Sequence, residues 1–499
     1  MIETIHSLLY GFQVALQPTH LMYCFFGVLI GTLVGVLPGL GPASAIAILL
    51  PATFKVTPVS SFIMLAGIYY GAMYGGSTTS ILVNIPGEAA SVVTCLDGYQ
   101  MALKGRAGPA LGIAAFGSFI AGTFAVIALT FVAPPLAGMA LKFGPPEYFS
   151  MMVVGILLLT YLSSGSMIKA LIMAGFGLIL SGVGMDTIGG EFRFTYGIRM
   201  LLDGIPMVPT VMGLFGISEV LLNLETEIRR DLLTNRVKNL LPTLKDWADS
   251  IWSIIRGTVL GFFLGIIPGG GAVIASFASY AIEKKVSKHP EEFGKGAIQG
   301  VAGPEAANNA AAGGAFIPLL TLGIPANPVV AVLLGSLIIH GLQPGPMLLS
   351  KAPDVFWGTI VSMYIGNAML LVLNLPLIPL WIQVLKVPYF LLYPLIFLFC
   401  LVGSYSIENN VGDVVIMLIF GIVGYLMKKF RYEGAPLVLA LVLGKMLETT
   451  LRQSLILSRG EFSIFVSRPI SLGFLIVAAL LLIMPVITQR KKLSTLEEE

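Results

Sequence analysis

Long apolar stretches dominate the pattern of hydrophobic and polar positions along this chain of 499 residues. Many of them approach the roughly 20 residues that a helix needs to cross the hydrocarbon core of a bilayer. The pattern predicts an all-α polytopic membrane protein with roughly 10–12 membrane segments. The clearest stretches are Leu21–Leu37, Leu111–Phe131, Met151–Leu162, Ile251–Ile267, Trp357–Trp381, Phe390–Val402, Val411–Met427 and Ile470–Ile487.

The composition agrees with this interpretation. Only 11% of the residues are charged and 56% are hydrophobic, whereas a soluble domain carries about 25% charged residues. The net charge of +3 gives no indication of a nucleic-acid partner. Cys24, Cys95 and Cys400 have no paired spacing, so they predict neither a disulfide framework nor a metal site. The first twenty residues contain no Lys or Arg, and we expect no cleavable signal peptide.

Two apolar stretches are interrupted by nearly the same glycine and proline pattern. Gly31–Gly41 reads GTLVGVLPGLG, and Gly261–Gly271 in the second half reads GFFLGIIPGGG, with the proline and glycines in the same register. Proline removes a backbone donor and glycine weakens a helix, so each pattern predicts a helix that ends inside the membrane. Such a break is tolerated only where protein encloses the freed backbone groups. Corresponding breaks in two halves of a chain are typical of the substrate site of a secondary transporter.

A second pair of breaks extends the repeat. GGSTTSILVNIPG at Gly75–Gly87 corresponds to GGAFIPLLTLGIPAN at Gly313–Asn327, at a slightly larger interval than the first pair. A polar stretch separates the two halves, and we expect it to form an amphipathic linker at a membrane surface. The predicted division is therefore a first repeat at 1–222, a linker at 223–250 and a second repeat at 251–499. Close packing of unbroken glycine-rich helices is the alternative.

The basic residues predict the orientation of the repeats. The positive-inside rule places the main basic clusters on the cytoplasmic side, and the N-terminus without basic residues outside. The first half then begins outside and the second inside, so the two repeats are inverted. Arg452, Arg459 and Arg468 do not fit this scheme unless their stretch lies along the interface. The four clusters are Arg229–Arg256, Lys284–Lys295, Lys428–Arg431 and Arg490–Lys492.

The breaks are surrounded by hydroxyls, amides and freed backbone groups, with almost no fixed charge. Freed N–H groups at the starts of half-helices suit a carboxylate, so we predict an anionic substrate held by dipoles. The alternative is that the Ser and Thr side chains bond back to their own helices. The predicted substrate-binding residues are Pro38, Gly39, Gly41, Ser77, Thr78, Thr79, Ser80, Pro268, Gly269, Gly270, Gly271, Asn308 and Asn309.

Oxygen ligands of the same kind suit a coupling cation such as Na⁺. Glu305 lies among Ala, Gly and Asn, where burial would favour proton uptake or cation binding. The alternative is a carboxylate at a water-exposed helix start after Pro304. The predicted coupling-ion residues are Asn84, Glu305, Thr321 and Asn327, with Na⁺ as a possible metal.

Several absences narrow the function. The chain has no G-x-x-x-x-G-K-[ST] loop, no H-E-x-x-H and no G-x-S-x-G. We therefore predict that it is not an enzyme and needs no cofactor beyond Na⁺ or H⁺ as coupling ion. No charge ring or filter motif stands out, but a channel stays open as an alternative.

Three stretches carry a family resemblance: Gly31–Phe54, Tyr69–Gly112 and Gly300–Gly341. They closely resemble the large membrane subunit of tripartite tricarboxylate transporters, and the likeness covers nearly the whole chain. The matching motifs lie at Pro38–Gly41, Gly75–Ser80, Pro268–Gly271 and Glu305–Asn309, with Gly303 where alanine is usual in the family.

The resemblance implies a secondary transporter that imports di- or tricarboxylates on a Na⁺ or H⁺ gradient. It implies two protein partners, a small membrane subunit and an extracytoplasmic solute-binding protein, in a bacterial inner membrane. By analogy with other binding-protein-dependent carriers, we expect an elevator-like movement. The alternatives are a stand-alone carrier or channel without a binding protein, and a membrane-embedded enzyme or assembly scaffold.

Overall fold

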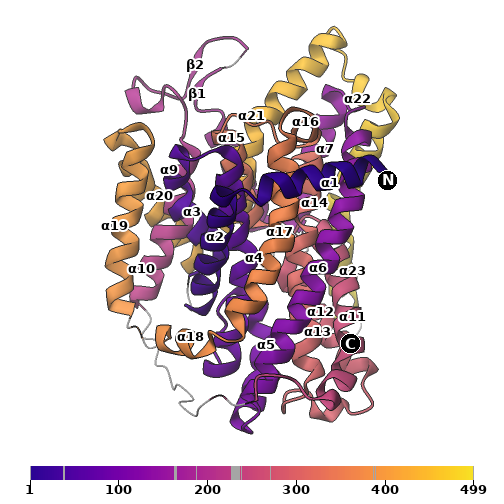
Figure 1. The fold of residues 1–499 in the computed structure, drawn as a ribbon. Helices are drawn as coiled ribbons and strands as arrows, with labels where there is room; N and C mark the ends of the chain where they lie inside the picture. Colours follow the sequence, from indigo (N-terminus) through magenta and orange to yellow (C-terminus); the bar gives the residue numbers. More distant parts are fainter. Residues whose placement is uncertain are drawn as a thin grey trace. The chain divides into compact units, whose positions relative to one another are not determined.

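The computed structural model describes residues 2–37, 40–161, 166–186, 188–225, 237, 239–269, 271–385, 387 and 389–497. Within these ranges the chain is almost entirely helical (Figure 1), and its one sheet is the short antiparallel pair β1–β2. Seven helices of the described part are long and apolar enough to cross a membrane, and five shorter helices are also apolar. The prediction of an all-α polytopic membrane protein is confirmed.

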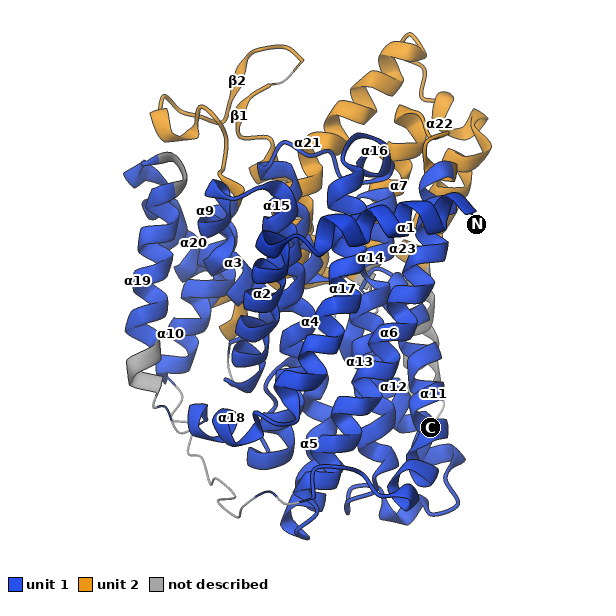
Figure 2. Ribbon diagram, in the orientation of Figure 1, with its two compact units in different colours: residues 1–138, 208–425 blue, residues 139–207, 426–499 orange. Residues whose placement is uncertain are grey.

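Contacts within the chain define two compact units, and each unit takes segments from both sides of the polar linker (Figure 2). Unit 1 contains residues 1–138 and 208–425, and unit 2 contains residues 139–207 and 426–499. The predicted division of the chain at 223–250 stays a prediction, because most of residues 226–238 lie outside the described part.

The helices of unit 1 before the linker are α1 (Ile2–Ala15), α2 (Pro18–Val36), α3 (Pro42–Leu49), α4 (Pro58–Val83), α5 (Val92–Leu103), α6 (Ala107–Ala140), α9 (Met207–Val211) and α10 (Ser218–Glu225). Short 3-10 helices at Leu50–Lys55 and Ala89–Ser91 precede α4 and α5, and a π-helical turn at Met212–Ile217 joins α9 to α10.

After the linker, unit 1 contains α11 (Leu244–Ile266), α12 (Gly271–Val286), α13 (Gln299–Gly314), α14 (Phe316–Leu322), α15 (Pro328–Ile339), α16 (Pro346–Lys351), α17 (Pro353–Asn374), α18 (Ile378–Val384), α19 (Tyr389–Glu408) and α20 (Val411–Lys429). Unit 2 contains α7 (Pro145–Tyr161), α8 (Met167–Ser181), β1 (Gly184–Met185), β2 (Phe192–Arg193), α21 (Gly434–Leu457), α22 (Ile464–Ser467) and α23 (Pro469–Glu497), with 3-10 helices at Arg199–Leu201 in unit 2 and Pro290–Glu292 in unit 1.

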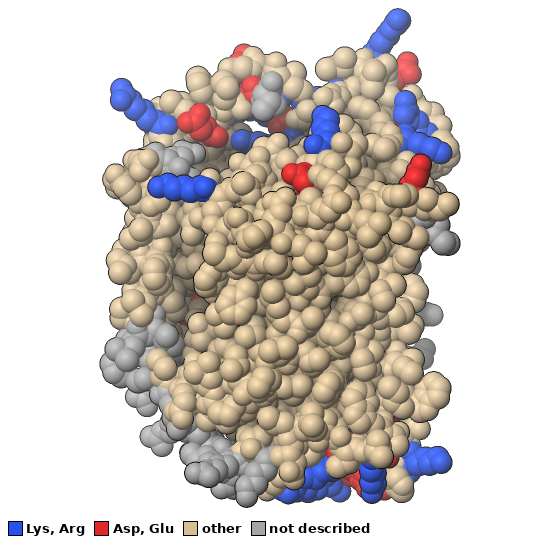
Figure 3. Space-filling view, viewed as in Figure 1, with Lys and Arg blue, Asp and Glu red and all other residues tan. Residues whose placement is uncertain are grey.

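Helix α4 is the centre of unit 1, because every residue from Val59 to Val83 is buried. A helix that is apolar or small on all sides can be covered all round by its neighbours. On the face shown in Figure 3, the charged side chains gather toward the two ends. The broad band between them, over α2, α4 and α17, is tan and so consists of residues other than Lys, Arg, Asp and Glu. Such a band is what a hydrocarbon layer requires.

Glycines on α2 allow α4 to pack at backbone distance. A Cβ added at Gly31 would lie 2.6 Å from Ile68 O, so the two helices could not approach so closely with any larger residue. Small residues at such an interface let backbones meet within a membrane. The contacts pair Gly27 with Met64, Gly31 with Ile68, and Gly35 with Ala72.

The second half repeats this contact between α11 and α13 in the same register. Each glycine on α11 corresponds to one on α2, and each partner on α13 corresponds to one on α4, at a constant offset in residue number for each pair of helices. A Cβ added at Gly261 would lie 2.6 Å from Ala307 Cα. The contacts pair Gly257 with Gly303, Gly261 with Ala307, and Gly265 with Ala311. Glycine packing is therefore present, but it accompanies the helix breaks and does not replace them.

Candidate transport site

The second breaks of the two halves have the same backbone geometry. Asn84 (φ 58°) follows the last residue of α4 and Gly323 (φ 71°) follows the last residue of α14, both in the left-handed region. An Ile-Pro pair follows in each, and an extended residue then caps the next helix. The caps are Glu88, whose carboxylate accepts from Ala90 N, and Asn327, whose amide oxygen accepts from Val330 N. A carboxylate or amide oxygen at this place satisfies a free N–H of the helix start.

The first breaks also fall where the glycine-proline pattern predicts them. Helix α2 ends at Val36, and Gly41 is the extended residue that precedes α3. Pro38 and Gly39 lie outside the described residues. A Cβ added at Gly41 would meet no atom of the described residues within 4 Å. The N-terminus of α3 therefore has room beside it.

In the second half, α11 ends at Ile266 and α12 begins at Gly271 (φ 51°). Gly269 (φ 84°) donates its N–H to Ala326 O at 2.7 Å, so the two breaks of this half meet. Pro268 precedes this contact and is half-buried, and Gly270 lies outside the described residues. A positive φ explains the glycines at 269 and 271, because other residues are strained there.

Reciprocal hydrogen bonds join the two halves. Asn327 Nδ2 donates to the Tyr69 hydroxyl at 2.8 Å, and Asn308 Nδ2 donates to Glu88 Oε1 at 3.1 Å. Asn308 is the second-half equivalent of Tyr69, and Asn327 is the second-half equivalent of Glu88. Both pairs have the same difference in residue number as the equivalent contact residues of α4 and α13. Each half thus offers a central-helix residue to the capping residue of the other half. Reciprocal contacts of this kind are what a two-fold relation between equivalent parts produces.

A second reciprocal pair has the same spacing. The Ser61 and Ser336 hydroxyls are hydrogen-bonded at 3.4 Å, and Gly300 packs against the carboxylate of Asp97. The same offset in residue number relates Gly300 to Ser61 and Ser336 to Asp97. The two contacts lie at different ends of unit 1, where Figure 1 places α15 and α5.

Equivalent central helices run in opposite directions. Tyr69 of α4 contacts the ring of Phe316 in α14, with centroids 6.0 Å apart. Two turns further along α4, Ser77 bonds to Glu305, which lies earlier in the second half than Phe316. As the residue number rises along α4, the residue numbers of its contact partners in the second half fall. Helix α4 therefore runs antiparallel to α13 and α14.

Glu305 lies at the centre of this contact with none of its surface exposed. Its carboxylate accepts from the Ser77 hydroxyl at 2.5 Å and from the Thr94 hydroxyl. Among the described residues it forms no ion pair, so its position depends on neutral donors. A buried charge held this way is costly unless a cation or proton joins it. The alternative of a water-exposed helix start is wrong in this structure, since Glu305 is inside α13.

The remaining predicted residues divide into two groups. The hydroxyls of Thr79, Ser80 and Thr321 donate to the backbone at Val36 O, Ser91 O and Ile317 O. These three residues therefore secure helix ends or their own helix. By contrast, Asn309 Nδ2 donates to Ser118 Oγ of α6 at 2.7 Å, and Thr78 lines a small cavity. Asn84 differs from both groups because its side chain is exposed. Their roles in binding stay predictions.

Sequence reasoning gave no role to several residues that the structure brings to this region. Thr94 of α5 donates to the Glu305 carboxylate. On α17, Asn367 bonds to Tyr74 at 2.5 Å, and Asn374 lines the same small cavity as Thr78. Asn367 and Asn374 are two helical turns apart in an apolar stretch. Two amides on one helix face within such a stretch are the signal that could have identified them.

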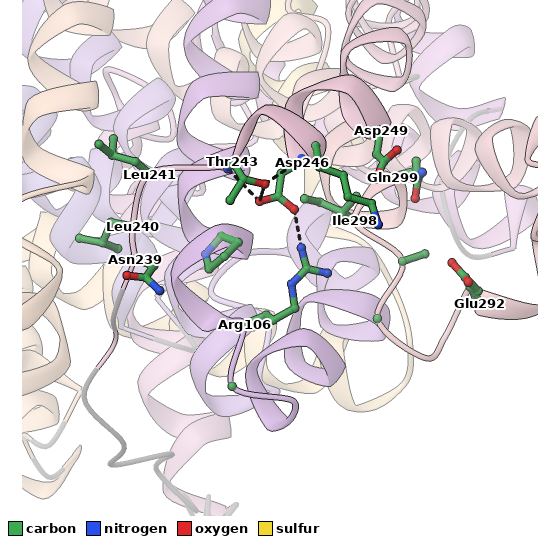
Figure 4. A pocket seen from close by; sticks show the side chains of 15 residues that line it. Arg106, Asn239, Leu240, Leu241, Thr243, Asp246, Asp249, Glu292, Ile298 and Gln299 are labelled. Carbon is green, nitrogen blue, oxygen red and sulfur yellow. Dashed lines mark hydrogen bonds and ion pairs between the residues drawn. The ribbon is translucent and has the colours of Figure 1, made fainter.

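A separate pocket of about 1020 Å³ lies where α5, α6 and α11 meet the loop before α13 (Figure 4). Arg106 forms an ion pair with Asp246, which also caps α11 through Thr243. Its lining carries both signs of charge, with Lys245, Asp249 and Glu292 beside the pair, and none of the predicted site residues lines it. Although this pocket is large, its lining gives no reason to place the carboxylate substrate there.

Broken helices in matching registers, packed around buried polar side chains, are features of a polytopic membrane transporter. Within that class, the model of the "Tripartite tricarboxylate transporter TctA family" matches residues 21–439, and the chain belongs to this family. It is thus a membrane subunit of tripartite tricarboxylate transport, and a tripartite system implies other subunits. The family is one of transporters and not an enzyme class.

Two relatives come from Agrobacterium vitis. One, described as an uncharacterized 52.8 kDa protein in the TAR-I ttuC' 3' region, is 52% identical over the full length of both chains. The other, described as an uncharacterized protein in the TAR-II ttuC' 3' region, is 50% identical over 48% of this chain and all of its own length. No solved structure matches the chain.

Proposed function

We propose that this chain imports organic carboxylates of the di- or tricarboxylate class, driven by a Na⁺ or H⁺ gradient. An extracytoplasmic solute-binding protein delivers the substrate, and a small membrane subunit works beside the chain in a bacterial inner membrane. The observation that carries the proposal is the pair of reciprocal hydrogen bonds, in which Asn327 donates to Tyr69 and Asn308 donates to Glu88. They bring the second breaks of both halves to the central helices.

The substrate's carboxylates bind at the helix starts beside the first breaks. Gly41 precedes α3 and Gly271 begins α12, so both starts present N–H groups that no earlier turn of their helix uses. The positive end of a helix dipole favours an anion. Since no Lys or Arg lies in either break, the anion is held without a fixed counter-charge, and it can leave again.

Transport uses two inverted repeats. The antiparallel course of α4 against α13 and α14, with the reciprocal contacts between halves, supports this relation. The glycine contacts keep α2 with α4 and α11 with α13 as two tight pairs. Such pairs move as rigid bodies in an elevator-like exchange between outward and inward access.

Two variants test the substrate site. Gly269→Leu forces a side chain into φ 84° and displaces the N–H that bonds to Ala326. Asn308→Ala removes the donor to Glu88. Both should reduce carboxylate uptake by more than tenfold while the protein still inserts in the membrane. Gly473→Leu is the matched control, since that exposed glycine has nothing within 4 Å of an added Cβ. Unchanged uptake in both site variants would overturn the assignment.

A further inference from the structure

A cavity of about 10 Å³ lies between α4, α6 and α17. Polar side chains from all three helices line it, namely Ser77, Thr78, Ser118 and Asn374. A space of roughly 10–15 Å³ holds one water or one small ion. A carboxylate substrate is far too large for the cavity in this conformation.

Asn374 shows that the cavity is an incomplete polar site. Its side chain is only 5% exposed, and its Nδ2 donates to Leu370 O at 3.0 Å. Its Oδ1 has no hydrogen-bond partner among the described residues. Leaving a buried amide oxygen unpaired costs free energy, which an added donor or cation would recover.

The neighbouring groups favour a cation over a further donor. Ser77 gives its proton to Glu305, so the lone pairs of its oxygen are left for another partner. Ser118 already accepts a hydrogen bond from Asn309. Neutral hydroxyl and amide oxygens are ligands for hard cations. The Glu305 carboxylate is one hydrogen bond away and supplies the compensating negative charge.

We propose that this cavity binds one Na⁺ ion, with Ser77, Thr78, Ser118 and Asn374 as side-chain ligands. The inference rests on the proposed function and locates its coupling ion. It moves that ion away from Thr321, whose hydroxyl bonds to its own helix, and from Asn327 and exposed Asn84. Asn327 uses both its nitrogen and its oxygen within the protein.

The location explains how an ion could be coupled to transport. Ser77 belongs to α4 and connects the ion to Glu305 on α13, and Asn309 on the same helix reaches Ser118. An ion in the cavity therefore joins α4, α6 and α17 to α13. Its loss leaves the buried carboxylate uncompensated, which disfavours the packed arrangement.

The test measures thermal unfolding of the full chain in lipid nanodiscs, in about 100 mM NaCl against about 100 mM choline chloride at one pH. Na⁺ should raise the wild-type unfolding temperature. Asn374→Leu and Thr78→Val should abolish that rise, whereas Asn374→Asp, which keeps an oxygen ligand, should retain it. Thr160→Val is the matched control, because the buried Thr160 hydroxyl only bonds to Ile156 of its own helix.

A Na⁺ effect that persists in both Asn374→Leu and Thr78→Val would overturn the site. The site would also be overturned if the wild-type protein unfolded at the same temperature in NaCl and in choline chloride. The cavity would then hold only water. The same proteins are assayed for carboxylate uptake under Na⁺ and H⁺ gradients. Uptake driven by an H⁺ gradient alone would support the proposed function but overturn the Na⁺ site. A Na⁺ effect without uptake under any gradient would leave the site standing without that function.

Discussion

The duplicated glycine contacts predict that substitution of either Gly31 or Gly261 destabilises the protein. An alanine Cβ would lie 2.6 Å from Ile68 O and 2.9 Å from Ile68 Cα in the first case, and in the second it would lie 2.6 Å from Ala307 Cα and closer still to Ala307 O. Ordinary van der Waals contact of a Cβ begins at 3.4 Å. Each helix pair must therefore separate by roughly 1 Å, and the obstacle is backbone that cannot rotate away.

The cost can be estimated from general values. Overpacking of a tightly packed site costs about 1–3 kcal/mol, and alanine regains about 1 kcal/mol over glycine through helix propensity. Because an alanine at a glycine with free space gains the same helix propensity, Gly31→Ala and Gly261→Ala should each lose about 1–3 kcal/mol relative to that control. Gly175→Ala in α8 is that control, since an added Cβ there meets nothing within 4 Å. It should be neutral or slightly stabilising.

The assay is thermal unfolding of the purified variants in nanodiscs, followed by circular dichroism. Both packed variants should unfold at a lower temperature than Gly175→Ala, with Gly261→Ala affected at least as much as Gly31→Ala. If they unfold at the same temperature as the control, the close helix contact is wrong. If only one of them is affected, the matching register of α2–α4 and α11–α13 is wrong.

Three further results are expected. Glu305→Gln should lower gradient-driven uptake by more than tenfold with the fold intact, because the amide cannot hold a proton or balance a cation; uptake within twofold of wild type would exclude Glu305 from coupling. Glu88→Gln should have a smaller effect on uptake, since its oxygen still caps the helix through Ala90; a loss equal to that of Glu305→Gln would contradict this ranking. The Arg452 guanidinium holds the pKa of Asp186 well below its ordinary value of 3.8. The Asp186–Arg452 ion pair, which ties the β1–β2 hairpin to α21, therefore persists above pH 3.8 and is lost only as the pH falls well below 3.8. Limited proteolysis of the hairpin should therefore be equal at pH 7 and pH 5 and faster in Asp186→Asn at both; an increase in wild-type cleavage between pH 7 and pH 5 would contradict the shift.

Much of the fold was predictable because proline and glycine act locally. The helix ends at Val36 and Ile266 follow from the Gly-Pro patterns, and the left-handed cap at Asn84 precedes an Ile-Pro pair that resists a helix. The offset between halves was also visible in the sequence. The two compact units were not, because they depend on which distant helices pack together.

The candidate site was predictable only in part. A hydroxyl in a helix can bond to the backbone of its own helix or to a neighbouring helix, and the amino-acid sequence does not distinguish the two cases. The Thr321 hydroxyl bonds to the backbone of its own helix, whereas the Ser77 hydroxyl bonds to Glu305 on another helix. The cross-pairing of Asn308 with Glu88 depends on which residues of the two halves face each other, and the predicted inversion of the repeats does not specify that. Asn374 was missed because its significance lies in a cavity shared by three helices.

The most direct test of the central claim is uptake into proteoliposomes that contain the chain and its small membrane subunit. Candidate carboxylates are supplied with the solute-binding protein, and Na⁺ and H⁺ gradients are imposed separately. We expect uptake above equilibrium only with the binding protein and one of the gradients, and its loss in Glu305→Gln. Carboxylate accumulation without any gradient, or equal accumulation without the binding protein, would contradict the account.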